Sequence, residues 1–177
     1  MRKQVRQWEA IFRPSESTWE CLSRFQFGDS IDRSATISLP TVENSYKERL
    51  IHVKQFIFDM DGVFTDGSAI ILSNGQSARQ MNFKDAFAIQ RATSQGLQIA
   101  VISRGHDEAY KEKLKYLGVQ DIYMGYLDKT EALEDLKAIY QWQKNDMLYM
   151  GDDLPDLEVM AQVGISCCPH DAVPEVR

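Results

Sequence analysis

Short apolar runs alternate with longer amphipathic segments along the second part of the chain. Each apolar run is bounded by glycine, serine or aspartate, a pattern typical of buried strands. We expect such strands at residues 54–59, 97–103, 119–124, 147–150 and 165–168. The segments between them place apolar residues on one face, which predicts helices at residues 85–94, 107–117, 128–140 and 155–163. Strands that alternate with helices indicate right-handed crossovers, so we predict an α/β fold with a three-layer, Rossmann-like parallel sheet.

A different pattern lies between the first strand and the first of these helices. Two strand-like runs, at residues 69–72 and 79–83, flank the sequence Ser-Asn-Gly-Gln at residues 73–76. An Asn-Gly pair between two such runs is a strong signal for a β-hairpin. Because the hairpin follows the first strand directly, we expect it to overhang the end of that strand as a flap.

The first 50 residues show no comparable periodicity. Polar residues are mixed there with isolated aromatic residues, and a short helix at residues 1–13 is the single element we expect. We therefore predict an irregular N-terminal extension at residues 1–50, followed by one domain at residues 51–177. An arm that binds a partner is the alternative interpretation of the extension.

Chemically active side chains follow several of the predicted strands. The carboxyl ends of parallel strands meet at the same edge of a sheet, where ligands bind in open α/β folds. The side chains expected to meet there are Asp59, Asp61, Ser103, Lys129, Asp152 and Asp153.

Composition narrows the class of protein. The chain carries 20 basic and 26 acidic residues, a net charge of −6, which argues against non-specific binding to nucleic acid. No run reaches the roughly 18 apolar residues of a membrane span, and no secretion signal is recognisable at the N-terminus. The three cysteines have neither zinc nor redox spacing, so we expect reduced thiols and a location in the cytoplasm.

The predicted cluster suits phosphoryl transfer. Asp59 and Asp152 are hard oxygen ligands for Mg²⁺, which would offset repulsion between an attacking carboxylate and a phosphate dianion. Lys129 and Ser103 would hold the phosphoryl oxygens. Asp59 would attack phosphorus, and Asp61 would act as general acid and base. Asp61 would then reach the metal through its backbone carbonyl, because a carboxylate beside a cation would be too acidic for proton transfer.

These residues resemble the four motifs of the haloacid dehalogenase superfamily of phosphatases. The resemblance rests on Asp-Met-Asp-Gly-Val at residues 59–63, Ser103, Lys129 and Gly-Asp-Asp at residues 151–153. More narrowly, the chain is similar to the capless 3-deoxy-D-manno-octulosonate 8-phosphate phosphatase family. That match covers about residues 53–174 and includes Phe-Thr-Asp-Gly at 64–67, the hairpin, Asn-Phe-Lys-Asp at 82–85 and the segment 151–156.

The resemblance implies a role for each group of residues. Asp59, Asp61, Ser103 and Lys129 would be catalytic, and Mg²⁺ would be bound by Asp59, the Asp61 carbonyl and Asp152. Asp153 and Asp156 would support the metal ligands or cap a helix. Substrate would be contacted by Asp61, Asn82, Phe83, Lys84, Asp85, Ala86, Arg104, Lys113 and Lys129. It also implies a cytoplasmic homotetramer without a cap domain, active in lipopolysaccharide biosynthesis, in which a neighbouring subunit covers the open site and the hairpin packs between subunits.

The sequence departs from the family pattern at several positions. The family usually has Thr-Gly-Arg after the second strand, where this chain has Ser103, Arg104 and Gly105. Ala86 stands where glycine is common, and Gln90 where arginine is common. A carboxylate substrate needs a cationic partner, for which Lys84, Arg91 or Lys113 are candidates. The family pattern continues after the segment that this chain matches, with a further strand and a tail that reaches the adjacent site. The sequence therefore predicts a truncated sheet edge that is exposed unless the N-terminal extension covers it.

Other functions compete with this interpretation. One alternative is a related phosphatase whose substrate would be an acylneuraminate 9-phosphate or a broad set of sugar phosphates. A signalling receiver domain also gathers acids, a hydroxyl and lysine around Mg²⁺. In a receiver, however, the adjacent acid pair usually follows the first strand and the phosphorylated aspartate follows a middle strand. Here the adjacent pair follows the fourth strand, and the middle strand ends in Ser103. A third alternative is a catalytically silent, truncated binding protein.

Overall fold

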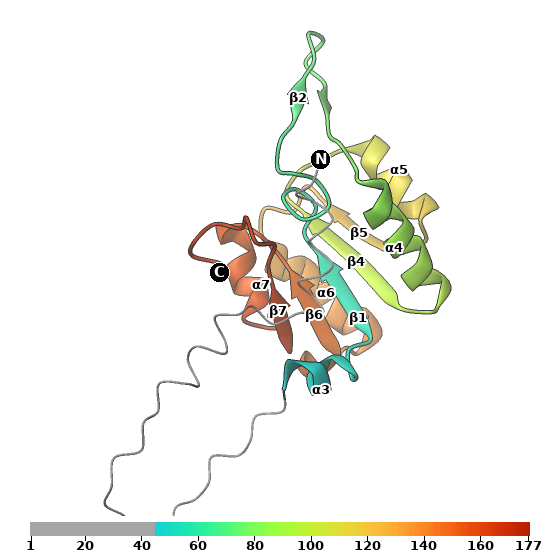
Figure 1. Cartoon of the computed structure of the whole chain (residues 1–177), viewed down its shortest axis with the longest axis vertical. Helices are drawn as coiled ribbons and strands as arrows, with labels where there is room; N and C mark the ends of the chain where they lie inside the picture. The colour runs from blue at the N-terminus through green and yellow to red at the C-terminus, as the bar shows by residue number, and fades with distance from the viewer. Residues whose placement is uncertain (1–44) are drawn as a thin grey trace, which may run out of the picture.

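The computed structural model describes residues 45–177, which form a five-stranded, fully parallel sheet with helices on both faces (Figure 1). The strand order is β5-β4-β1-β6-β7, so the first strand in sequence lies at the centre. The strands are β1 (Gln55–Phe58), β4 (Gln98–Ser103), β5 (Asp121–Met124), β6 (Met147–Met150) and β7 (Ile165–Cys167). The predicted three-layer α/β architecture is therefore confirmed.

Two hydrophobic clusters separate the three layers. One face of the sheet packs against α4 (Phe83–Ser94) and α5 (Glu108–Tyr116), and the other against α6 (Lys129–Tyr140) and α7 (Leu157–Met160). Within β1, Phe58 belongs to the first cluster and Ile57 to the second. Successive side chains of a strand point to opposite faces, and because both faces are covered, the strands read as continuous apolar runs.

The hairpin β2 (Ile70–Ile71) and β3 (Ser77–Ala78) projects from the sheet as a long, thin extension (Figure 1). The prediction of a second hairpin strand at residues 79–83 was wrong. The ladder pairs only two residues on each side, and residues 79–82 then lead directly into α4. Two-stranded ribbons without a third strand or a packed face have little to stabilise further pairing.

Helix caps decide the remaining boundaries. The helix predicted at residues 85–94 begins earlier, because Asn82 caps α4: its side chain accepts a hydrogen bond from the Lys84 amide. Asp85 lies instead in the first turn and is buried. Asp107 and Asp128, the first residues of two predicted helices, are the residues that cap α5 and α6.

The helix predicted at residues 155–163 is shorter and is split. A capping box between Asp153 and Asp156 tightens its start into the 3₁₀ helix η3 (Leu154–Asp156), and α7 ends at Met160. A second 3₁₀ helix, η2 (Lys144–Asp146), precedes β6.

The predicted N-terminal extension overlaps the described residues only at its end, from residue 45 to residue 50. The short helix at residues 1–13 and the proposed arm lie outside the described residues, while Tyr46–Leu50 form α3. The domain boundary at residue 51 stays a prediction. Within residues 45–177, no helix has the length and apolar character needed to cross a membrane.

Candidate active site

The carboxyl ends of the central strands surround one polar cavity of about 230 Å³. Side chains from four separate segments line it, as strand polarity predicted. The cavity residues include Asp59, Asp61, Ser103, Arg104, Lys129, Asp152, Asp153 and Asp156. The geometric condition for a shared site is therefore met, while the role of each residue stays a prediction.

Lys129 is the buried cation of this cavity. It is the first residue of α6, and the Asp128 cap fixes that end of the helix beside the sheet. Its Nζ lies 2.9 Å from Asp59 Oδ1 and 2.7 Å from Asp156 Oδ1. Because the side chain of Lys129 is only 3% exposed, it presents one fixed positive charge at the end of β1.

Asp156 organises the opposite side of the cavity and is completely buried. Its Oδ1 accepts hydrogen bonds from Lys129 Nζ and, at 2.6 Å, from the Tyr149 hydroxyl. Its Oδ2 accepts bonds from the backbone amides of Asp152 at 3.0 Å and Asp153 at 3.2 Å. Both oxygens are thus occupied, and the residue positions the lysine and the Asp152–Asp153 turn.

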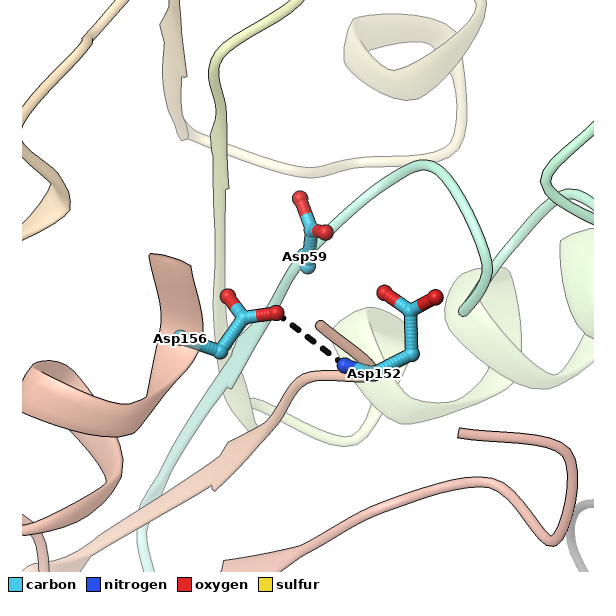
Figure 2. Close-up of side chains that lie close together, drawn as sticks. All are labelled: Asp59, Asp152 and Asp156. Carbon is cyan, nitrogen blue, oxygen red and sulfur yellow. Dashed lines mark hydrogen bonds between the residues drawn. The ribbon is translucent and has the colours of Figure 1, made fainter. Parts of the chain in front are cut away.

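Three carboxylates lie close enough to hold a cation. Asp59, Asp152 and Asp156 each offer an oxygen within 4.8 Å of the others, and Figure 2 shows them converging from β1 and from the segment after β6. Since Asp156 is already fully hydrogen-bonded within the protein, Asp59 and Asp152 are the two with free oxygen positions. This favours the pair predicted from the sequence, with Asp156 behind it.

Electrostatics also favour a cation between these two residues. Burial raises the pKa of Asp59 from 3.8 to about 7, an effect that Lys129 opposes. Burial, followed by the charges of Asp156 and Asp153, raises the pKa of Asp152 from 3.8 to about 6. Partly desolvated carboxylates that repel one another gain stability from a hard divalent ion, so the donor set fits Mg²⁺.

Gly62 leaves room for the Asp152 carboxylate. The residue has φ of +84°, and a Cβ built on it would overlap the Asp152 carboxylate. Glycine therefore meets two requirements there, a left-handed backbone and close approach to a candidate ligand.

The Asp61 carboxylate is held by contacts that the sequence did not reveal. Its Oδ1 accepts bonds from Arg79 Nε at 2.7 Å and from Thr65 Oγ1 at 3.3 Å. Thr65 Oγ1 also accepts bonds from the amides of Gly62 and Gly67, each at 3.3 Å. Thr65 thus connects the turn to Asp61. The sequence analysis did not identify Arg79 as a site residue. Its position could have suggested this role, because it is a basic residue at the base of a hairpin expected to overhang the site.

Ser103 ends β4 with its side chain at the cavity. It is 1% exposed, and its Oγ accepts a hydrogen bond from the Gly105 amide at 3.1 Å. Its hydroxyl hydrogen is available to an anion in the cavity. Arg104 lines the same cavity and is exposed.

The other residues predicted to contact substrate lie elsewhere. None of residues 82–86 lines the cavity: Asn82 caps α4, Ala86 is in the core, and Phe83 is 86% exposed. Lys113 lies on α5 with its Nζ 5.0 Å from the centre of the Tyr116 ring. Contact of these residues with substrate stays a prediction.

Comparison with known proteins agrees with this geometry. A family model described as haloacid dehalogenase-like hydrolase matches residues 108–177, the part that carries Lys129 and Asp152. The 3-deoxy-D-manno-octulosonate 8-phosphate phosphatase of Yersinia pestis is 32% identical over 127 residues, which are 72% of this chain and 68% of that protein. The chain thus spans about two thirds of the length of this curated relative.

Solved structures give the same result. The crystal structure of the phosphatase from Yersinia pestis superimposes with a TM-score of 0.70 at 32% identity, covering 72% of this chain and 69% of that one. The phosphatase from Moraxella catarrhalis, solved with a magnesium ion, a phosphate ion and the sugar acid KDO, gives 0.70 at 28% identity, covering 73% and 75%. The chain therefore belongs to the 3-deoxy-D-manno-octulosonate 8-phosphate phosphatase family, whose members are phosphoric monoester hydrolases among the haloacid dehalogenase-like hydrolases.

Proposed function

We propose that this protein hydrolyses a phosphate monoester of a sugar acid in a Mg²⁺-dependent reaction, with 3-deoxy-D-manno-octulosonate 8-phosphate as the preferred substrate. The observation that carries the proposal is the meeting of Asp59, Lys129 and Asp152 at one cavity, with Asp61 at its rim. A nucleophile, a fixed cation, a metal ligand and a proton donor are the groups that phosphoryl transfer requires. The named activity of the Yersinia pestis relative supports the choice of substrate.

The proposed reaction assigns a residue to each step. An oxygen of Asp59 attacks phosphorus as the bond from phosphorus to the ester oxygen breaks, which leaves an aspartyl-phosphate. The Asp61 carboxyl gives its proton to the departing alkoxide. A water molecule then attacks the phosphorus of the intermediate and passes a proton to Asp61, so that phosphate leaves and both side chains regain their initial states. Lys129 and Ser103 hold the phosphoryl oxygens throughout.

Asp59 and Asp152 would hold the magnesium ion, with the Asp61 carbonyl as the third protein ligand. When bound, the ion neutralises charge on the phosphoryl group and on Asp59. Asp156 fixes the Asp152 backbone and Lys129 from behind. The magnesium found in the Moraxella catarrhalis structure supports this choice of metal.

Turnover of defined substrates tests this function. We expect the protein to release phosphate from 3-deoxy-D-manno-octulosonate 8-phosphate with Mg²⁺ and to lose this activity in EDTA. Asp59→Asn should abolish turnover, while the matched variant Asp171→Asn, on an exposed residue outside the cavity, should retain it. Normal turnover by Asp59→Asn would rule out the covalent mechanism.

The same experiment separates the alternatives. Faster turnover of N-acetylneuraminate 9-phosphate would assign the related substrate, and similar rates on many sugar phosphates would indicate a broad enzyme. Mg²⁺ binding without turnover of any of these esters would favour the silent binding protein. A phosphorylated form that lasts many minutes would favour a receiver domain.

A homotetramer is the second part of the proposal. Large apolar side chains are exposed on the hairpin and on the neighbouring face of α4: Ile70 (69%), Ile71 (74%), Leu72 (42%), Phe83 (86%) and Phe87 (68%). Contact between copies would remove this apolar surface from water. Light scattering during gel filtration tests it: the Ile71→Ser variant should dissociate, and an unchanged mass would contradict packing through the hairpin. The cytoplasmic location stays a prediction.

A further inference from the structure

Arg79 connects the hairpin to the cavity. It directly follows β3, and its guanidinium reaches down to the end of the sheet, where its side chain is only 13% exposed. Its Nε lies 2.7 Å from Asp61 Oδ1, and one terminal nitrogen lies 3.1 Å from Asp107 Oδ2. Asp107 is fixed in turn, because it caps α5 through the Tyr110 amide. The guanidinium thus bridges two carboxylates from different segments.

The space for this guanidinium depends on Gly105. A Cβ built at Gly105 would lie 3.0 Å from Arg79 Nη2, 3.3 Å from Asp61 Oδ2 and 3.5 Å from Ser103 Oγ. A residue with a longer side chain at position 105 would therefore compete with Arg79 for the region beside Asp61 and Ser103. Arginine suits such a bridge, since its planar group can donate to two acceptors in fixed directions.

We propose that Arg79 is a positioning residue that holds the Asp61 carboxylate in place for proton transfer to the leaving group, so that the hairpin forms part of the catalytic site of its own subunit. This proposal rests on the hydrolase function proposed above. The Asp61 side chain is 37% exposed, and among residues 45–177 its other hydrogen bond is the longer one from Thr65. Because proton transfer requires a donor within hydrogen-bond reach of the ester oxygen, freedom of this carboxylate slows the step. The positive charge of Arg79 is shared with Asp107, and its contact to Asp61 is through Oδ1, so the bridge fixes the carboxyl group while Oδ2 carries the proton.

The leaving group reveals whether Arg79 acts through Asp61. An alkyl phosphate needs a proton at its departing oxygen, whereas p-nitrophenyl phosphate releases a stable phenolate without one. Asp61 also takes a proton from water in the second step, which is common to both esters, so the comparison uses the rate of leaving-group release in the first turnover. For Arg79→Ala we expect this rate on the sugar phosphate to fall by roughly 10- to 100-fold, part of what a general acid contributes. On p-nitrophenyl phosphate the first-turnover rate should change by less than about threefold, and KM should stay similar on both substrates.

Three variants complete the experiment. Gln80→Ala alters the exposed neighbour in the same arm of the hairpin and should behave as wild type on both substrates. Arg79→Lys keeps the charge but cannot bridge both carboxylates, so its loss should be intermediate and equally selective. Asp107→Asn keeps a side chain able to cap α5 while removing the ion pair, and it should show a smaller loss of the same kind.

Two results would overturn the proposal. Equal losses of the first-turnover rate on both substrates would show a general structural role, and a raised KM with an unchanged first-turnover rate would show direct contact with substrate. If wild type hydrolyses neither ester, the proposed function fails, and hydrogen exchange then tests the bridge separately. Arg79→Ala should speed exchange of the amides at residues 77–80 and 107–110 by at least tenfold, whereas unchanged exchange would refute the bridge itself.

Discussion

Replacement of Gly62 by alanine tests the position of the metal site. The residue has φ of +84°, and the added methyl group would overlap the Asp152 carboxylate. Gly96 provides a matched control, because it has φ of +82° and no atom lies within 4 Å of the position that its added methyl group would take. Both variants therefore carry the same backbone strain, while only Gly62→Ala displaces a candidate ligand.

The magnitude follows from separating these two effects. Alanine in a left-handed conformation costs about 1–2 kcal/mol, so both variants should lose this amount of unfolding free energy. Displacement of Asp152 should reduce Mg²⁺ affinity by roughly 100-fold, the upper range for disturbed ligand orientation, or nearly 3 kcal/mol. The Gly96→Ala variant should bind Mg²⁺ as wild type does.

Thermal and urea unfolding with and without Mg²⁺ measures both effects. At about 100 times the wild-type dissociation constant, Mg²⁺ should stabilise wild type and Gly96→Ala by roughly 2.7 kcal/mol. At the same concentration, it should stabilise Gly62→Ala by less than about 0.5 kcal/mol. Equal stabilisation of all three proteins would refute the assignment of Asp152 as a ligand at this position.

Three further predictions concern the buried charges. Tyr149→Phe removes the 2.6 Å bond to Asp156 Oδ1, and urea unfolding should show a loss of about 1–2 kcal/mol, since three other donors to Asp156 remain. Lys129→Met leaves Asp59 and Asp156 without their shared cation, so the metal-free protein should lose roughly 3–5 kcal/mol of unfolding free energy in the same assay. The control Lys137→Met removes an ion pair with the exposed Glu134 on α6 and should lose much less. The raised pKa of Asp59, about 7 against 3.8, means that its carboxyl holds a proton in the folded state after the unfolded chain has lost it. Its contribution to stability therefore falls as pH rises from about 4 to 7. Without metal, Asp59→Asn should have a higher melting temperature than wild type at pH 8, and the difference should shrink toward pH 4. The opposite trend would contradict a raised pKa for Asp59.

Much of the site could be predicted from the sequence, because the direction of parallel strands determines which residues reach the same edge of the sheet. Asp59 and Asp152 follow β1 and β6, Ser103 ends β4, and parallel strands bring their carboxyl ends to one edge. The hairpin turn and the caps at Asp107 and Asp128 are also local, so short stretches of sequence carry their signals. The start of α4 lies earlier than predicted, because the cap is Asn82 and not Asp85, and asparagine and aspartate are both favoured at that position.

The sequence by itself thus determined the order of the elements, the parallel sheet and the chain segments that supply the acids. Tertiary structure decided which side chains meet: Arg79 with Asp61 across 18 residues, and Lys129 with Asp156 across 27. Such contacts depend on how a hairpin arm and a helix start are placed in space, and on side-chain rotamers that packing selects. Periodicity reports which face of an element is buried, but it carries no information about the partner that a buried charge finds there.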